Sequence, residues 1–388
     1  MKADPISREA AATLQVYDQL PFVPKGASGC DLLTEDGQRI LDYWGGHAVA
    51  ALGHGHPNLV QSICKQSERM IFQSNAVALD VRATAAERLV SVAPANLTKA
   101  FFVNSGAEAN ENALKIAFKA TGRKKILALT HGFHGRTAAA GAVTWKSDTS
   151  WYGFPNTPFE VGFIPRNDIA SAVSMIDDRV AAVIFEPVQG VAGAFDLAED
   201  FVAALRDCTS KVDAILIADE VQCGMGRCGH YFVVEAYGIE PDLLTAAKGL
   251  GGGIPCGALL CSESLSKTIG KGDLGSTFGG GPIAAAAIVA VIETIASEDL
   301  LANAKKREAE IRAHCITGPV KSIQGKGLLL GLVCDRPAAE VRDALLKNEI
   351  LTGTSADPDV LRLLPPLVLQ SAHVMRLAHA LDNLQKDS

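Results

Sequence analysis

The central part of the chain repeats one pattern, in which a short apolar run is followed by a glycine-rich or polar turn and then by residues with helical spacing. The apolar runs are rich in β-branched residues and lack clean alternation, as is typical of strands buried on both faces of a sheet. Strands that alternate with helices predict a mostly parallel α/β sheet, whose ligands bind beyond the carboxyl ends of the strands. The pattern occurs at 98–120, 124–137, 179–190 and 212–226.

The two ends of the chain follow other patterns. Residues 29–46 predict a hairpin with Asp36-Gly37 at its turn. From Pro282 an alanine-rich run predicts a helix that ends near Ala296, and a more charged helical stretch follows it.

Residues 320–334 then look like strand sequence. Because neither end alone contains enough apolar sequence for a core, we expect the ends to combine into one smaller α+β domain. The predicted organisation is a large α/β domain at 57–281 and a small domain made from 1–56 and 282–388.

Composition narrows the class of protein. The 388 residues are 48% hydrophobic and 20% charged, which excludes a disordered chain. The 36 Lys and Arg against 43 Asp and Glu give a net charge of −7, so no basic surface for nucleic acid or an anionic membrane is expected. No apolar run approaches the roughly 20 residues of a membrane span, and the N-terminus lacks the apolar stretch of a secretion signal. We expect a cytoplasmic protein.

The nine cysteines contain no C-x2-C pair. Cys223 and Cys228 are five apart, as are Cys256 and Cys261, so a four-thiolate zinc site is arithmetically possible. Reduced, buried thiols in a cytosolic enzyme are the favoured interpretation, and no metal is expected.

An anion site is predicted where the first central strand ends. Asn104, Ser105, Gly106 and Ala107 follow an apolar run and begin a helix. Free amide groups at a helix N-terminus bind anions, and Ser105 adds a hydroxyl. A plain serine cap with a glycine turn explains the same residues without any ligand.

Asp219 and Lys248 both lie in apolar surroundings at predicted strand ends. A buried Asp needs a cation or strong donor, such as a protonated pyridine nitrogen, although capping of the next turn is an alternative. Burial lowers the pKa of a lysine amine, as Schiff-base chemistry requires, whereas a surface lysine would have polar neighbours. The glycines after Lys248 fit neither a dinucleotide fingerprint nor a phosphate loop.

Two further residues are candidates for ligand contacts. Thr277 lies in a glycine-rich loop before a helix, where an anion site or an ordinary flexible loop are both possible. Phe133 offers an aromatic face for a flat ring, although a core phenylalanine is the default.

In this order the motifs closely resemble the class III pyridoxal-phosphate aminotransferases of fold type I, and among them the acetylornithine aminotransferases. The resemblance covers about residues 29–366. The matching motifs are GGHAVAALGHGHP (45–57), NSGAEANENALK (104–115), FHGRT (133–137), EPVQG (186–190), ADEVQCGMGRCG (218–229), PDLLTAAKGLGGGIPCGALL (241–260) and GSTFGGGP (275–282).

The resemblance implies an enzyme of amino-acid metabolism with pyridoxal 5'-phosphate as its cofactor. Lys248 would form the internal aldimine and later move the substrate proton, and Asp219 would pair with the pyridinium nitrogen. The remaining cofactor contacts would come from Ser105, Gly106, Ala107, Phe133, Glu186, Val221, Gln222 and Thr277.

Within that set, Phe133 and Val221 would cover the two faces of the ring, and Gln222 would reach its hydroxyl oxygen. Ser105, Gly106 and Ala107 would hold the phosphate. Thr277 would reach the phosphate from a partner subunit, so the resemblance implies a homodimer with shared sites.

Two arginines would bind substrate carboxylates. Arg136 would take the α-carboxylate of the amino donor, and Arg362 would take a carboxylate of the 2-oxo acid acceptor through a bidentate fork. The donor would be a diamino acid such as acetylornithine, and the acceptor 2-oxoglutarate.

The substrate region departs from the family at several positions. Val191 replaces the Glu that neutralises the second arginine in family members that use ω-amines, and His47 stands where the family has Ile. In the loop 72–81, Ser74 and Asn75 are kept but the aromatic residue that usually follows is absent. These changes indicate a specialised pocket, in which Arg362 faces substrates without its carboxylate; neutral drift is the alternative.

Three functions are compatible with these residues. The leading one is an aminotransferase that uses an acetylornithine-like donor. A pyridoxal-phosphate lyase, decarboxylase or mutase on the same scaffold would use the same Lys248 and Asp219. A non-catalytic binding protein is disfavoured, because it would not need Lys248, Asp219, Gln222 and Thr277 together.

Overall fold

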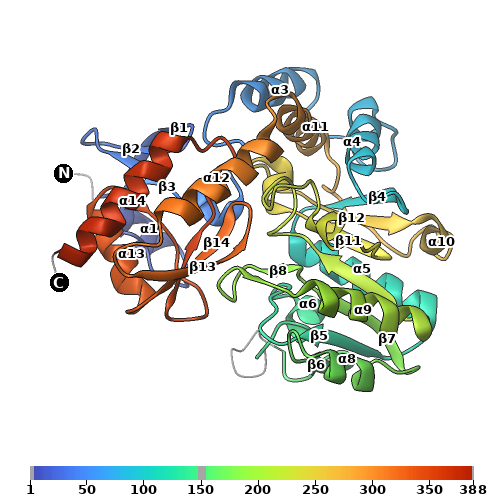
Figure 1. Ribbon diagram of the computed structural model, residues 1–388. Coiled ribbons are helices and arrows are strands. Elements are labelled where there is room, and N and C mark those ends of the chain that lie inside the picture. The colour runs from blue at the N-terminus through green and yellow to red at the C-terminus, as the bar shows by residue number, and fades with distance from the viewer. Residues whose placement is uncertain (1–3, 147–153, 387–388) are drawn as a thin grey trace.

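The computed structural model describes residues 4–146 and 154–386 (Figure 1). Its centre is a seven-stranded sheet with the strand order β4-β12-β11-β10-β7-β5-β6. The strands are β4 (Leu97–Val103), β5 (Lys125–Leu129), β6 (Glu160–Ile164), β7 (Val180–Phe185), β10 (Ile215–Asp219), β11 (Leu243–Ala246) and β12 (Gly257–Ser262).

Six of these strands run in one direction, and β12 runs against its neighbours β4 and β11. The mostly parallel sheet predicted from the sequence is therefore confirmed. A parallel arrangement brings the carboxyl ends of β4, β5, β7, β10 and β11 to one edge. In the register, Asp219 at the end of β10 lies beside Thr245, three residues before Lys248.

Helices cover both faces of this sheet. On one face, α5 (Gly106–Thr121) packs over Ile184 and Ile217, and on the other α9 (Glu199–Lys211) packs over Val183 and Leu216. Successive strand residues therefore point into different cores, which explains why the strands read as continuous apolar runs. The shorter helices α6 (Ala138–Ala142), α8 (Ile169–Met175) and α10 (Glu263–Ser266) complete this part.

Strands outside the central sheet form smaller sheets, and all of these strands except β8 and β9 come from the two ends of the chain. The hairpin β2–β3 is antiparallel with Asp36-Gly37 in its turn, as predicted, and β3 also pairs with β15 from the C-terminal part. The sheets consist of β1 (Pro24–Ser28), β2 (Asp31–Thr34), β3 (Arg39–Asp42) and β15 (Ile350–Leu351); of β13 (Val320–Lys326), β14 (Leu329–Cys334) and β16 (Val360–Leu363); and of β8 (Val188–Gln189) and β9 (Phe195–Asp196). The strand-like sequence at 320–334 is thus a hairpin of two strands.

The remaining helices include the predicted alanine-rich helix, α11 (Pro282–Ser297), which ends one residue beyond Ala296. It packs against α3 and α4 of the central part. The boundaries between the large and the small domain, at 56/57 and 281/282, stay a prediction. The other elements are α1 (Pro5–Ala12), α2 (Gly45–Ala48), α3 (Pro57–Arg69), α4 (Asp80–Ser91), α12 (Leu300–His314), α13 (Ala338–Lys347), α14 (Ser371–Lys386) and the 3-10 turns η1 (Val233–Tyr237) and η2 (Lys248–Gly251).

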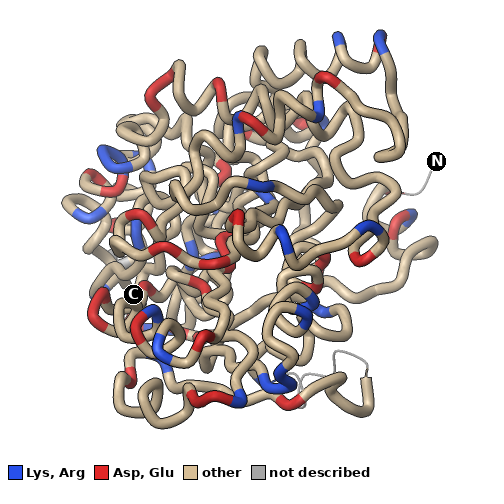
Figure 2. Tube along the Cα trace, turned by 90° about the vertical axis from the view of Figure 1, so that its right-hand side faces the viewer, with Lys and Arg blue, Asp and Glu red and all other residues tan. Residues whose placement is uncertain are grey.

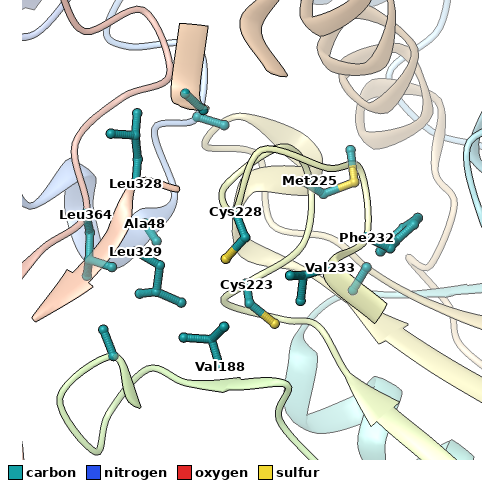
Figure 3. Packing of buried hydrophobic residues seen from close by; sticks show 14 of the residues in the cluster. Ala48, Val188, Cys223, Met225, Cys228, Phe232, Val233, Leu328, Leu329 and Leu364 are labelled. Carbon is teal, nitrogen blue, oxygen red and sulfur yellow. The ribbon is translucent and has the colours of Figure 1, made fainter. Parts of the chain in front are cut away.

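A buried cluster joins the ends of the chain to the loop that follows β10. Figure 3 shows Cys223 and Cys228 of this loop with Leu328, Leu329 and Val188 on one side and Met225 and Val233 on the other. All nine cysteines are free thiols, and Cys64 is the exposed one. The buried cysteines thus act as small apolar side chains in the core.

Charged residues of both signs are mixed over the trace in Figure 2. Within residues 4–146 and 154–386, no helix has the length and hydropathy to cross a bilayer. In the same part of the chain, no group of three or more His, Cys, Asp or Glu side chains is arranged to hold a metal ion.

Candidate active site

A cavity of about 470 Å³ opens at the edge where the parallel strands end. Each of the parallel strands β4, β5, β7, β10 and β11 is followed by a segment that contributes to it, from Asn104 after β4 to Lys248 after β11. Eleven of the predicted site residues line the cavity: Ser105, Gly106, Ala107, Phe133, Arg136, Glu186, Val191, Asp219, Val221, Gln222 and Lys248.

The N-terminus of α5 presents amide groups to the cavity. Ser105 is the N-cap, and its Oγ accepts the N–H of Glu108 at 3.2 Å. The N–H groups of Gly106 and Ala107 have no acceptor among the described residues. A Cβ on residue 106 would lie 2.7 Å from the Val221 methyl groups, so glycine is needed where α5 meets this wall. Free N–H groups at a helix N-terminus suit a phosphate.

The Asp219 carboxylate is buried and receives three hydrogen bonds. Its Oδ2 accepts from Asn110 Nδ2 at 2.8 Å and from His134 Nδ1 at 2.7 Å, and its Oδ1 accepts from the Val221 N–H at 3.0 Å. Asn110 is fixed in turn by Thr245, whose Oγ1 donates to its Oδ1 at 2.8 Å. These donors compensate the burial of the carboxylate and fix its orientation.

Lys248 follows β11 with a left-handed backbone, φ 44°. A non-glycine residue in this region is strained, and such strain gathers at functional sites. Burial lowers the pKa of the Lys248 amine, and the nearby charges of Asp219 and Glu186 oppose that shift. A lowered pKa makes the amine available as a nucleophile and base.

Glu186 follows β7, lines the cavity and is buried. Its Oε1 accepts the Phe133 N–H at 2.8 Å, and its Oε2 accepts the Gly190 N–H at 3.3 Å. Burial raises the pKa of this carboxyl, whereas the neighbouring His134 acts to lower it. Glu186 therefore ties the Phe133 loop to the EPVQG loop.

Arg362 on β16 lies behind the cavity, outside its lining, and is buried. Its Nε donates to the Thr354 carbonyl at 2.8 Å, its Nη1 donates to the Gly190 carbonyl at 3.1 Å and to Gln222 Oε1 at 3.4 Å, and its guanidinium lies 4.8 Å from the Trp44 ring centre. Burial lowers the pKa of Arg362 to about 10.

Among the described residues, Arg362 forms no ion pair with a carboxylate. Arg362 thus lacks a carboxylate partner, as the sequence led us to expect, but its guanidinium has other partners. Three oxygen acceptors and an aromatic face stabilise it, so the lost carboxylate costs less than the sequence alone suggested.

His47 stands in a turn of four left-handed residues, Gly45 to Ala48, with φ between 53° and 69°. Its Nδ1 lies 3.2 Å from Trp44 Nε1, which donates to it. Burial, followed by the charges of Arg362, Lys248 and Arg136, lowers the pKa of His47. His47 is exposed and does not line the cavity.

Four predicted residues do not line the cavity: Arg362 and His47, described above, and Asn75 and Thr277. Thr277 is exposed, and Asn75 donates to the carbonyls of Ser276 at 3.0 Å and Gly279 at 3.1 Å. Asn75 thus holds the Thr277 loop within this chain and does not reach the cavity. Phe72 and Phe278 form an exposed ring pair beside that loop, with centres 5.3 Å apart.

Sequence reasoning missed three residues of the site. Asn110 lies one helical turn beyond Gly106 in a motif that was noted only for its start, and His134 follows Phe133 directly. Trp44 precedes the GGHAV motif and carries the Arg362 contact. A polar side chain within an apolar helix was the available signal for Asn110.

The residues present fit pyridoxal 5'-phosphate. The cavity has free amide groups at one end, a buried carboxylate with one oxygen bonded only once, and a lysine whose amine pKa is lowered. Phe133 and Val221 also line it and can cover a flat ring. When bound, this cofactor supplies an electron sink for a negative charge that develops on the substrate.

The family model for class III aminotransferases matches residues 13–385. The chain belongs to this family and is an aminotransferase, as its resemblance predicted. The family implies an amino donor and a 2-oxo acid as substrates.

Individual relatives agree with this assignment. Acetylornithine aminotransferase of Methanocaldococcus jannaschii is 38% identical over 98% of this chain and 97% of its own length. Acetylornithine aminotransferase of Mycobacterium tuberculosis is 36% identical over 95% of this chain and 92% of its own length.

Solved structures share the fold. Ornithine aminotransferase of Toxoplasma gondii superposes with a TM-score of 0.92 at 26% identity, over 99% of this chain and 95% of its own. Acetylornithine aminotransferase of Elizabethkingia anophelis does so with a TM-score of 0.87 at 27% identity, over 99% and 98%. These neighbours confirm the predicted α/β fold of the pyridoxal-phosphate aminotransferases.

Proposed function

We propose that this aminotransferase uses pyridoxal 5'-phosphate bound to Lys248, and that it moves an amino group from an acetylornithine-like diamino acid to a 2-oxo acid such as 2-oxoglutarate. The observation that carries the proposal is the convergence of Lys248, Asp219 and the α5 N-terminus on one cavity. A Toxoplasma gondii ornithine aminotransferase of the same fold contains pyridoxal phosphate at partial occupancy.

The cofactor contacts follow from the donors and acceptors on the cavity wall. The amides of Gly106 and Ala107, with the Ser105 hydroxyl, hold the phosphate. Asp219 accepts the ring N–H, and Phe133 and Val221 cover the ring faces. Gln222 turns Oε1 toward Arg362, which leaves its amide N–H groups to donate to the ring hydroxyl oxygen. Glu186 acts indirectly, because it fixes the Phe133 backbone.

Lys248 moves the proton in the reaction. Its lowered pKa favours the unprotonated amine, which would accept a proton from the substrate carbon and later return it. Burial of the cavity floor keeps water from competing for that proton.

Two arginines bind the substrate carboxylates. Arg136 lines the cavity and lies 5.5 Å from the Phe133 ring centre. It binds the α-carboxylate of the donor. Arg362 binds a carboxylate of the acceptor, after Gln222 and the Gly190 carbonyl yield part of its hydrogen-bonding capacity.

The substrate region is specialised by Val191 and His47. Val191 follows the residue whose carbonyl accepts from Arg362, and it supplies no carboxylate there. We infer that the physiological substrate places an anion or a hydrogen-bond acceptor against Arg362 and His47. Turnover of acetylornithine with 2-oxoglutarate is then slower than in family members that retain the Glu.

A homodimer with shared sites completes the proposal. Thr277 is exposed and Asn75 fixes its loop, so that loop is available to a second copy of the chain. The exposed Phe72 and Phe278 beside it provide apolar area for such a contact. The homodimer and the cytoplasmic location stay predictions.

The test starts from the protein freed of cofactor. Adding pyridoxal 5'-phosphate should give the visible absorbance of a lysine-bound cofactor, and candidate amines should bleach it. Supplying 2-oxoglutarate should restore the absorbance and release glutamate. Bleaching without any amino-acid product from the 2-oxo acid would contradict transamination and point to a lyase, decarboxylase or mutase.

A further inference from the structure

Arg136 lies in a loop that is held by helix α5 on both sides of the arginine. Gly135, which precedes it, packs on the start of α5, where an added Cβ would lie 2.8 Å from the Ala107 side chain. Thr137, which follows it, donates its hydroxyl to Glu111 Oε1 at 2.6 Å, in the second turn of the same helix. Arg136 is therefore placed between two contacts with one helix.

Glu111 also caps the short helix α6, which begins directly after this loop. Its Oε1 accepts the N–H groups of Ala139 at 2.7 Å and of Ala140 at 3.0 Å. The first N–H groups of a helix have no partner in their own helix and need an acceptor from elsewhere. Thr137 is the N-cap residue but forms no capping bond within α6, because its hydroxyl donates to Glu111. Three donors next to Arg136 thus meet one carboxylate oxygen.

The spacing along α5 connects this contact to the phosphate-binding end of the site. Ala107 and Glu111 are four residues apart, so they lie on the same face of the helix, about 6 Å apart along its axis. In the proposed function the Ala107 N–H is one of the groups that hold the phosphate. One turn of helix therefore determines the distance between that N–H and the Arg136 loop. Glu111 itself is not among the described residues that line the cavity.

We propose that Glu111 is a positioning residue, which holds the segment 135–140 against α5 and so fixes Arg136 where the α-carboxylate of the amino donor binds. The inference rests on the proposed function. It assigns Glu111 an effect on substrates that carry an α-carboxylate, through Arg136 and without any contact between Glu111 and the substrate.

The cofactor end of the same loop is held by other bonds. The His134 N–H donates to Thr144 Oγ1 at 2.9 Å, and Thr144 Oγ1 donates to the Gly135 carbonyl at 3.0 Å. The Phe133 N–H donates to Glu186 at 2.8 Å. None of these bonds involves Glu111, so its loss should move the Arg136 end of the loop and leave the end that contacts the cofactor in place.

The test compares two amines that differ only in the α-carboxylate. N-acetylputrescine is acetylornithine without that group, and both present the same terminal amine for transfer. The second-order rate constant with which each amine bleaches the lysine-bound cofactor is measured in the holoenzyme without a 2-oxo acid. The ratio of the two constants reports what the α-carboxylate contributes to the transition state. The dissociation constant of pyridoxal 5'-phosphate and the melting temperature without cofactor are measured on the same proteins.

Two substitutions of Glu111 separate its hydrogen bonds from its size. Glu111→Gln keeps an oxygen acceptor at the same place, whereas Glu111→Leu fills similar space without an acceptor. The matched control is Asp168→Leu, which removes a carboxylate cap from another short helix, α8. Asp168 accepts the Ser171 N–H at 3.0 Å and is not among the described residues that line the cavity.

We expect Glu111→Leu to lower the ratio about tenfold through the acetylornithine constant alone, with cofactor affinity within about twofold of wild type. Glu111→Gln should keep the ratio within about threefold of wild type. Asp168→Leu should lower the melting temperature and leave the ratio unchanged. Thr137→Val, which removes only the hydroxyl donor beside Arg136, should lower the ratio about threefold and provides the test if Glu111→Leu does not fold.

Two results would overturn the inference while leaving the proposed function intact. One is a wild-type ratio in Glu111→Leu or in Thr137→Val. The other is an equal loss for both amines, which would make Glu111 a purely structural cap. If the wild-type protein bleaches equally fast with both amines, the α-carboxylate role proposed for Arg136 is wrong, and this inference falls with it.

Discussion

The cofactor side and the substrate side of the site are built in different ways. The cofactor side, made of Ser105, Phe133, Asp219, Val221 and Lys248, comes from segments that follow neighbouring strands of one sheet. The substrate side, made of Trp44, His47, Val191 and Arg362, comes from a left-handed turn, a loop and a strand of a smaller sheet.

The hydrogen bonds differ in the same way. On the cofactor side, the buried charge of Asp219 is met by three donors. On the substrate side, the buried charge of Arg362 is met by neutral oxygens and an aromatic ring. An anion from a substrate can therefore still improve the surroundings of Arg362, whereas Asp219 is already largely satisfied. The groups of the cofactor side are therefore held in place by the fold, whereas the substrate side can still gain a favourable interaction from a substrate.

The largest effect is expected at Lys248, on the cofactor side. Lys248→Ala should abolish turnover, because both covalent catalysis and proton transfer depend on this amine. The fold should be kept, so the melting temperature should change little and pyridoxal 5'-phosphate should still bind without a covalent link. Steady-state assays and absorbance spectra check this. Near-wild-type activity would refute the assigned chemistry.

The next prediction concerns Glu220, which follows Asp219 in the chain, and the pH dependence of the stability of the protein. Burial raises the pKa of Glu220 from 4.5 to about 8, and its oxygens accept the N–H groups of Val233 at 2.7 Å and Val234 at 2.8 Å. The folded state therefore binds this proton more tightly than the unfolded state. The stability that the proton contributes is fully present below pH 4.5 and is lost as the pH rises through about 8.

We expect this one group to lower the free energy of unfolding by an amount on the order of 4 kcal/mol between pH 5 and pH 9. Glu220→Gln, which cannot ionise, should show a flatter pH dependence over that range. Denaturant unfolding at several pH values measures both proteins. Parallel pH profiles would show that Glu220 does not titrate as described.

Val191 tests the substrate side. A fully buried arginine without an anion would cost about 3–5 kcal/mol, but the acceptors around Arg362 reduce that penalty. Val191→Glu should therefore improve transamination of ω-amine donors by about tenfold to a hundredfold and impair the native reaction.

The control at this position is Val191→Gln, which has the size of Glu without its charge and should not improve the ω-amine reaction. Values of kcat/KM for acetylornithine measure the effect. The specialised pocket would be disproved by a wild-type enzyme that turns over acetylornithine as fast as its relatives, together with a silent Val191→Glu.

The smallest effect is expected at Thr277, which the cofactor side would receive from a second copy of the chain. Thr277→Ala should weaken pyridoxal 5'-phosphate binding about tenfold, by loss of one hydrogen bond to a charged group. Thr268→Ala, an exposed threonine in the preceding segment, should have no effect. Light scattering should show a dimer, and an active monomer at assay concentration would contradict the shared site.

Much of the cofactor side could be predicted from the sequence. Buried strands of a parallel sheet read as continuous apolar runs, and polar residues directly after such runs must gather at one edge. Ser105, Asp219 and Lys248 were found in this way, and the structure brings them to one cavity. Hairpin and helix boundaries at the chain ends followed from local turn and helix signals, which depend on neighbouring residues alone.

Other features depended on contacts between distant residues, which no local pattern encodes. The pairing of β3 with β15, the binding of His134 and Asn110 to Asp219, and the packing of Trp44 on Arg362 were decided by the tertiary structure. A hydrogen bond between buried side chains depends on distances of a few tenths of an ångström. The sequence thus determined which residues meet at the edge of the sheet, and only the folded chain decided how their charges are compensated.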